Sequence, residues 1–301
     1  MSRRLELVIT PELAGIRVDT LLKRHMGLSG TVVRRIKWLE DGILVDGIRV
    51  NTRFCPAAGQ VLSARLSDPQ RSSGIVPVPG PLEIVYEDED IIVLNKAPGV
   101  SVHPGPGHFD DTIGNFLIYY YEMSRQEADF HPVHRLDRGT SGLLVIAKHP
   151  HAQEILKRQL HTDSFLRIYL AVCEGVPDPP AGAINVPLGP KPGSLMEQMV
   201  RSDGKPALTR YRTLEVRKNL ALLRLELDTG RTHQIRVHMA HIGHPLTGDF
   251  LYGTENRAMI SRPALHSSEL TFQHPLTRKP LAFRLALPED MAVLLEMLPR
   301  P

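Results

Sequence analysis

A proline-rich segment between residues 67 and 81 is the feature that most constrains how this chain can fold. Four prolines stand in it, with Ser and Gly between them. Such a segment cannot continue a helix or lie inside a sheet, because proline fixes φ and has no backbone N–H to donate. The chain of 301 residues also exceeds the length of one typical domain. We therefore expect an N-terminal domain over 1–67, a linker over 68–82 and a second domain over 83–301.

The expected N-terminal domain carries two helices and a hairpin. Apolar residues recur at helical spacing within 15–25, and Ser29 is a suitable N-cap for a second helix that runs to residue 39. Residues 43–51 have the pattern of a strand, an Asp-Gly turn and a second strand. This part is therefore predicted to be a small α/β unit.

Positive charge is concentrated at this end of the chain. The whole chain has a net charge of +3, whereas residues 1–70 hold eleven Lys or Arg against seven Asp or Glu and so carry +4, which leaves −1 for the rest. The apolar face of the second helix leaves Arg34, Arg35 and Lys37 to face outward. Cations on a rigid element suit contacts with the phosphates of a nucleic acid. A solvated helix face is the alternative that charge alone leaves open.

Beyond the linker, short apolar strands alternate irregularly with a few helices. We expect strands over residues 82–86, 91–95, 143–147, 168–172 and 223–228. We expect helices over residues 112–121, 151–160, 232–242 and 289–298. The irregular order predicts an α+β domain around a mainly antiparallel mixed sheet rather than a doubly wound one.

Composition and missing motifs exclude several classes of protein. Two cysteines cannot form a disulfide framework, and no run of about 18 apolar residues or secretory signal is present. The chain contains no G-x-G-x-x-G after a strand, no phosphate-binding loop and no H-E-x-x-H. We therefore expect a cytoplasmic protein without membrane contact, which uses no metal and no nucleotide or nicotinamide cofactor.

Two further arrangements could suggest a catalytic site. His238, His241 and His244 are spaced by three, but acidic ligands are nearly missing around them and Gly and Pro break the helix. Ser141 with His134 could suggest a hydrolase, but the sequence around Ser141 is not a G-x-S-x-G elbow. We expect neither a metal site nor a serine hydrolase.

Two polar segments stand at the ends of expected strands. In the first, 134–142, Asp137 is flanked by arginines whose charges favour the ionised carboxylate. In the second, 228–239, a strand ends where a helix begins, which presents Arg231 and backbone N–H groups toward an anion. An ordinary surface ion pair is the alternative for Asp137 taken alone. Two such segments together predict one cleft.

These segments resemble a known family. Residues 134–142, H-R-L-D-R-G-T-S-G, resemble the H-R-L-D-x-x-T-S-G signature of RluA-type pseudouridine synthases, and residues 229–249 are similar to a second long motif of that family. Three shorter family segments match residues 96–103, 167–171 and 264–266. The N-terminal part resembles the S-four RNA-binding domain over residues 15–66. The departures are small: Ala97, Arg167 and Gly139 replace Pro, Lys and an acidic residue that are common there.

The resemblance implies an isomerase of the pseudouridine synthase fold that turns uridine within RNA into pseudouridine. Asp137 would be the essential carboxylate, which either attacks the anomeric carbon or takes a sugar proton, and Arg231 would pair with it. Tyr169 would lie against the uracil and help to remove the proton from carbon 5, unless it is a buried core tyrosine. Arg135 would fill the gap left by the flipped base. His134, from the same motif, would bind the substrate.

The resemblance also implies a binding partner, and two alternative functions stay open. Structured RNA is the expected substrate, with large-subunit ribosomal RNA first and tRNA possible, and we expect a monomer without a required protein partner. A non-catalytic RNA-binding or ribosome-assembly protein on the same scaffold is the competing class. A hydrolase that releases free uracil is the third.

Overall fold

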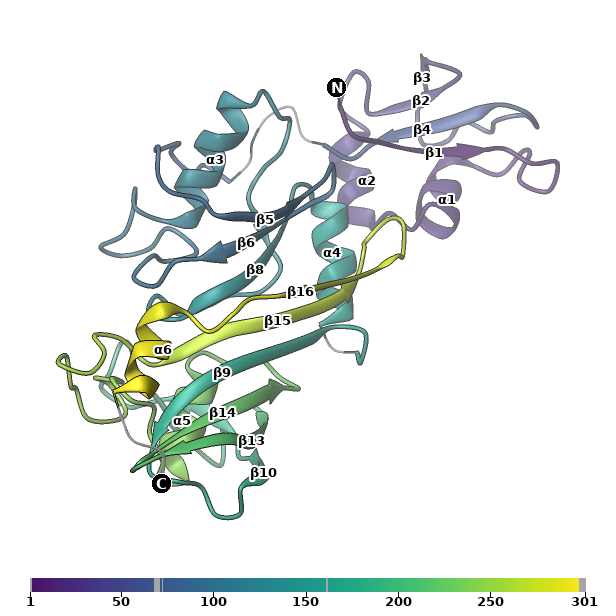
Figure 1. The fold of residues 1–301 in the computed structure, drawn as a ribbon. Coiled ribbons are helices and arrows are strands. Elements are labelled where there is room, and N and C mark those ends of the chain that lie inside the picture. The colour runs from purple at the N-terminus through teal and green to yellow at the C-terminus, as the bar shows by residue number, and fades with distance from the viewer. Residues whose placement is uncertain (1, 68–70, 72, 161, 298–301) are drawn as a thin grey trace.

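A computed structural model describes residues 2–67, 71, 73–160 and 162–297. Figure 1 shows a small sheet built by the first residues at one end of the molecule and a long curved sheet that fills the rest. Within the described ranges, no helix has both the length and the apolar character needed to cross a membrane.

The small sheet has the antiparallel strand order β1-β4-β2-β3. Its elements are β1 (Arg4–Val8), α1 (Val18–Thr20), the π-helical turn η1 (Leu21–His25), α2 (Gly30–Ile36), β2 (Ile43–Val45), β3 (Ile48–Arg49) and β4 (Val61–Arg65). The Ser29 hydroxyl accepts a hydrogen bond from the backbone N–H of Val32 at 3.3 Å, which confirms the predicted N-cap. Asp46 and Gly47 both have positive φ, as a two-residue hairpin turn between twisted strands requires.

The large sheet has ten strands. These are β5 (Ile84–Glu87), β6 (Ile91–Lys96), β7 (His131–Pro132), β8 (Ser141–Ala147), β9 (Leu166–Glu174), β10 (Ala181–Asn185), β13 (Leu208–Arg217), β14 (Leu220–Leu227), β15 (Leu265–Gln273) and β16 (Pro280–Arg284). The main order is β10-β13-β14-β9-β15-β8-β6-β5, with β16 beside β15 and β7 beside β8. Only the β15–β8 pair is parallel among the described strands of this sheet. The predicted α+β fold around a mainly antiparallel sheet is confirmed. A separate two-stranded ribbon joins β11 (Leu188–Pro190) and β12 (Gln198–Val200).

Helices cover both faces of the large sheet. They are α3 (Ile113–Met123), α4 (Pro150–Gln159), α5 (Gln234–His241) and α6 (Glu289–Glu296). Strand β8 shows why its sequence is apolar throughout: Leu144 and Ile146 pack with α3 and α5, whereas Leu143 and Val145 pack with α4 on the other face. All four predicted helices are present, and only residue 298 of the predicted C-terminal helix lies outside the described residues.

The described residues 73–81 of the proline-rich segment form neither helix nor strand, as predicted, and they are held against α3. The Asn115 side chain donates to the carbonyl of Val76 at 2.8 Å, and the Val78 N–H donates to the carbonyl of Asn115 at 3.2 Å. A Cβ at Gly80 would lie 2.3 Å from the Phe116 ring, so only glycine fits there. Residues 68–70 and 72 of this segment lie outside the described residues. The division into domains stays a prediction.

Candidate active site

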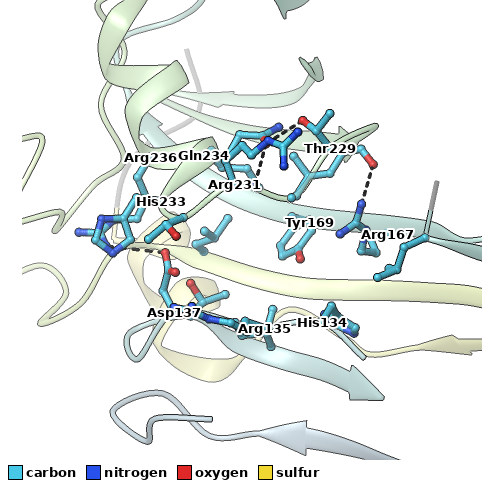
Figure 2. Close-up of a pocket in the computed structure, with 18 of the residues that line it drawn as sticks. His134, Arg135, Asp137, Arg167, Tyr169, Thr229, Arg231, His233, Gln234 and Arg236 are labelled. Carbon is cyan, nitrogen blue, oxygen red and sulfur yellow. Dashed lines mark hydrogen bonds and ion pairs between the residues drawn. The ribbon is translucent and has the colours of Figure 1, made fainter. Parts of the chain in front are cut away.

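A pocket of about 290 Å³ opens where the loop before β8, the middle of the sheet and the loop before α5 meet (Figure 2). Asp137 comes from the first of these elements, Tyr169 from β9 and Arg231 from the last. The prediction that the two polar segments form one cleft is therefore confirmed.

Hydrogen bonds from the end of β6 and the segment after it hold the loop that carries Asp137. The buried Lys96 ammonium donates to the carbonyls of Ala97 at 2.8 Å, Val100 at 2.9 Å and Arg138 at 3.2 Å. The Arg138 side chain returns to the carbonyl of Gly99 at 2.7 Å. Burial lowers the pKa of Lys96 to about 7, and the charge of Asp137 acts in the opposite direction. These hydrogen bonds hold the backbone of the Asp137 loop rigidly, which is what a reactive side chain needs.

The partner of Asp137 is Arg236, on α5. Its Nη1 lies 3.7 Å from Oδ2 of Asp137 (Figure 2). The other side of this buried guanidinium makes two hydrogen bonds of 2.7 Å to Asp249, which is fully buried. Burial works against the charged form of Arg236, but the hydrogen bonds to Asp249 and the charges of Asp249 and Asp137 outweigh it and raise its pKa. Asp249 thus fixes the cation that faces Asp137.

The predicted pairing of Arg231 with Asp137 is wrong in this structure. Arg231 lines the same pocket, but its Nε donates to the carbonyl of Pro206 at 3.0 Å. The reason is where the helix starts: α5 begins at Gln234, after His233 in a left-handed conformation with φ 55°. Arg231 therefore stays in the loop, and Arg236 in the first helical turn points inward. Both arginines belong to the segment predicted from sequence. The start of the helix decides which of them faces Asp137.

Strand β9 contributes two pocket residues from one face. Arg167 and Tyr169 are two positions apart, so both side chains point to the same side of the sheet. Burial raises the pKa of Tyr169, the nearby Arg167 charge lowers it and the Asp137 charge raises it. The phenol is therefore protonated at neutral pH. Tyr169 packs in the main hydrophobic core and also lines the pocket, so it has features of both alternatives. Sequence reasoning did not predict that Arg167 lies in the pocket and noted this residue only as a departure from the family pattern.

His134 and Arg135 also line the pocket, in different environments. His134 is buried, its Nε2 accepts the backbone N–H of Val145 at 3.4 Å, and its ring lies edge-on to Phe165. Burial, with the charge of Arg167, lowers the pKa of His134 to about 3, so the imidazole is neutral at pH 7. Arg135 is exposed at the pocket wall.

The basic helix α2 presents fewer outward cations than predicted. Arg34 and Lys37 are exposed, but Arg35 is half-buried and lines a crevice with Pro150 at the start of α4. The prediction that all three face outward is wrong for Arg35, because α2 packs beside the start of α4. Sequence reasoning also missed Trp38, which is 77% exposed and has the Lys37 ammonium 4.8 Å from its ring centre.

One group of side chains outside the pocket has the residue types of a metal site. Asp88, Asp90 and His274 bring ligand atoms together within 4.8 Å. These groups already pair with each other and with neighbours: His274 contacts Asp88 at 2.9 Å, and Arg3 and His149 contact Asp90 at 2.8 and 3.0 Å. The Arg3 cation supplies the positive charge that a metal would otherwise bring, so this cluster ties the N-terminus to the large sheet.

Known proteins share this sequence and fold. The sequence pattern of the RNA pseudouridylate synthase family matches residues 90–241. The chain is 38% identical to the uncharacterized RNA pseudouridine synthase YjbO of Bacillus subtilis over 90% of this chain and 96% of the relative, and 38% identical to ribosomal large subunit pseudouridine synthase D of Escherichia coli O157:H7 over 86% and 85%. The solved structure of human RNA pseudouridylate synthase domain containing 1 aligns with a TM-score of 0.56 at 26% identity, over 74% of this chain and 99% of that one. With its carboxylate and arginine in one pocket, the chain belongs to the RNA pseudouridylate synthase family, the isomerases that convert uridine in RNA to pseudouridine.

Proposed function

We propose that this protein converts specific uridines of large-subunit ribosomal RNA to pseudouridine, with Asp137 as the essential carboxylate. The observation that carries the proposal is the Asp137 side chain at the pocket, 22% exposed and 3.7 Å from a guanidinium that Asp249 holds in place. The choice of RNA rests on the identity to ribosomal large subunit pseudouridine synthase D. A protein acting on that RNA works in the cytoplasm, and we propose that it does so as a monomer.

The reacting group in this proposal is the Asp137 carboxylate. It either attacks the anomeric carbon or removes a proton from the sugar, and in both cases it must be ionised. Arg236 takes the role that was predicted for Arg231: its guanidinium faces the Asp137 carboxylate and fixes its orientation. Tyr169 lies in the same pocket, where it contacts the uracil ring and assists removal of the proton from carbon 5.

The uridine must leave its stack to reach Asp137. Extruding a base from structured RNA costs roughly a few kcal/mol. Arg135 is exposed two residues before Asp137, so it can enter the gap and stack by its guanidinium plane. His134 shapes the pocket beside it as a neutral imidazole. Phosphate contacts from Arg34 and Lys37 on α2 offset the cost.

The test is to map pseudouridines. Purified protein is incubated with transcribed large-subunit ribosomal RNA and, separately, with bulk tRNA transcripts, and pseudouridines are located by carbodiimide modification and primer extension. We expect conversion at discrete positions of the ribosomal RNA. Conversion confined to tRNA would refute the choice of RNA. Binding without conversion would support the non-catalytic class, and free uracil in the supernatant would support a hydrolase.

A further inference from the structure

One wall of the pocket carries a buried cation that the protein does not neutralise. Arg167 is 5% exposed. Its Nη2 makes a long hydrogen bond of 3.4 Å to the carbonyl of Leu227, and its buried Nε has no hydrogen-bond partner. Among the described residues, no carboxylate forms an ion pair with it. A buried charge without a counter-charge is unfavourable, so this guanidinium is suited to a negatively charged or strongly polar ligand.

The chain makes room for this guanidinium on the pocket wall. A Cβ at Gly230 would lie 2.9 Å from Nη1 of Arg167, so any larger residue there would push the guanidinium away. Gly230 is itself in the pocket lining, in the loop before α5. The position of the cation is therefore fixed by strand β9 on one side and by a glycine on the other.

The position of Arg167 relative to Asp137 indicates which part of a nucleotide it meets. Figure 2 shows Asp137 and Arg236 at one end of the pocket, Arg167 at the other and Tyr169 between them. The charges of Asp137 and Arg167 both act on the Tyr169 phenol, which agrees with this order. If the ribose of the flipped uridine lies at Asp137, as the proposed function requires, its base extends past Tyr169 toward Arg167.

The reaction creates negative charge on that base. When the C1′–N1 bond breaks, its electron pair leaves with uracil, which becomes an anion with charge spread over N1 and the two carbonyl oxygens. Carbon 5 of the anion then forms the C1′–C5 bond, the proton on carbon 5 is lost and N1 gains a proton, so atoms and electrons balance. The anion forms whether Asp137 attacks the sugar or removes a sugar proton.

We propose that Arg167 is a catalytic residue that hydrogen-bonds to a carbonyl oxygen of the flipped uracil and stabilises the uracil anion when the glycosidic bond breaks. The inference rests on the proposed function. A buried donor held in a fixed position favours the charge that develops in the transition state over the neutral ground state. Loss of the cation should therefore slow the bond-breaking step more than it weakens RNA binding.

The experiment compares Arg167→Gln, Arg167→Lys and wild-type protein on two versions of one RNA. The RNA is the ribosomal fragment that contains the mapped uridine, made with uridine or with 5-fluorouridine at that position. The fluorine makes the base a better leaving group, so bond breaking depends less on stabilisation by the protein. Single-turnover rates of nucleoside consumption are measured by chromatography and mass spectrometry after digestion, and RNA affinity is measured separately. Arg257→Gln, at a residue with a 79% exposed side chain, is the control.

We expect Arg167→Gln to lower the rate on uridine about 100-fold or more, the usual loss when one such donor is removed. RNA affinity should change less than about threefold, and the loss on 5-fluorouridine should be at least about tenfold smaller than on uridine. Arg167→Lys should recover much of the rate because it keeps the charge. The melting temperature of Arg167→Gln should not fall, because the cation has no carboxylate partner to lose.

Equal losses on the two RNAs, or a loss seen only in RNA affinity, would overturn the inference and leave the proposed function standing. A falling melting temperature with no change in the ratio of the two rates would make Arg167 structural. A wild-type protein that converts no uridine would contradict the proposed function itself.

Discussion

Arg236 and Arg167 lie at the two ends of one pocket, and each is 5% exposed. They differ in whether a carboxylate neutralises the charge. Arg236 has two carboxylates, Asp249 at 2.7 Å and Asp137 at 3.7 Å. Arg167 has a single carbonyl at 3.4 Å. The difference teaches that burial alone does not define the role of a charge. A compensated cation organises other side chains, and an uncompensated one is available to a ligand.

The largest effect on conversion should come from replacing Asp137, the carboxylate at the Arg236 end of the pocket. Asp137→Asn keeps the shape of the side chain and removes its charge, so we expect conversion to be abolished while the fold and RNA affinity stay nearly intact. Turnover on the mapped ribosomal RNA, RNA affinity and melting temperature are measured together. If this variant kept even a tenth of wild-type turnover, the role given to Asp137 would be wrong.

The next largest effect is the difference in conversion rate between variants of Arg236 and of Arg231. Arg236→Ala removes the cation beside Asp137, and we expect conversion to fall about 100-fold or more. Arg231→Ala removes a loop residue bonded to a carbonyl, so conversion should fall less than about tenfold. Rates under single turnover decide between them. A larger loss for Arg231→Ala than for Arg236→Ala would support the predicted pairing of Arg231 with Asp137.

Removing the carboxylate partner of Arg236, so that this cation resembles Arg167, should lower the stability of the protein. Asp249→Asn leaves Arg236 buried with Asp137 as its remaining charged neighbour, and breaking a buried pair in this way lowers the free energy of unfolding by about 3–5 kcal/mol. Urea denaturation measures it, with Arg167→Gln as the matched variant at a cation that has no ion pair among the described residues. A stability loss at Arg167 as large as at Asp249 would remove the contrast between the two ends.

The contrast between engaged and available cations extends to the surface of α2. Arg34 and Lys37 are exposed, and changing both to Ala should weaken RNA binding and reduce the slope of log affinity against log salt by about 1.5. Filter binding across a salt series measures the slope, with Arg257→Ala as the control. An unchanged slope would mean that this helix face is simply solvated.

The smallest expected effect is on the pKa of His134, which the charge of Arg167 lowers. Burial and the Arg167 cation lower its pKa to about 3, far below the ordinary 6.5. Because the folded state resists this proton, His134 contributes stability that is fully present above pH 6.5 and is lost as the pH falls toward 3. In Arg167→Gln the pKa of His134 should rise, as followed by NMR titration. A pKa that stays unchanged would place Arg167 too far from the pocket for the role we propose.

Much of the fold follows from local patterns. The Ser29 cap, the Asp46-Gly47 turn and the apolar run of β8 were all predicted, because each depends on a few neighbouring residues. The order of strands and the parallel pairing of β15 with β8 were not predictable in this way. Nor was the packing of α2 beside α4, which leaves Arg35 half-buried. These features depend on contacts between distant segments.

The sequence by itself determined the family and the two segments that meet in the pocket, since motif residues keep their spacing along the chain, and it predicted Asp137 as the reacting carboxylate. Only the tertiary structure decided which arginine faces Asp137 and which buried cation has no carboxylate partner among the described residues. Arg231 and Arg236 lie five positions apart in one segment, and their roles depend on a helix that starts at Gln234 and on Asp249, which reaches back from the chain beyond that helix. Compensation of a charge is a matter of distance and burial in three dimensions, which residue order alone does not specify.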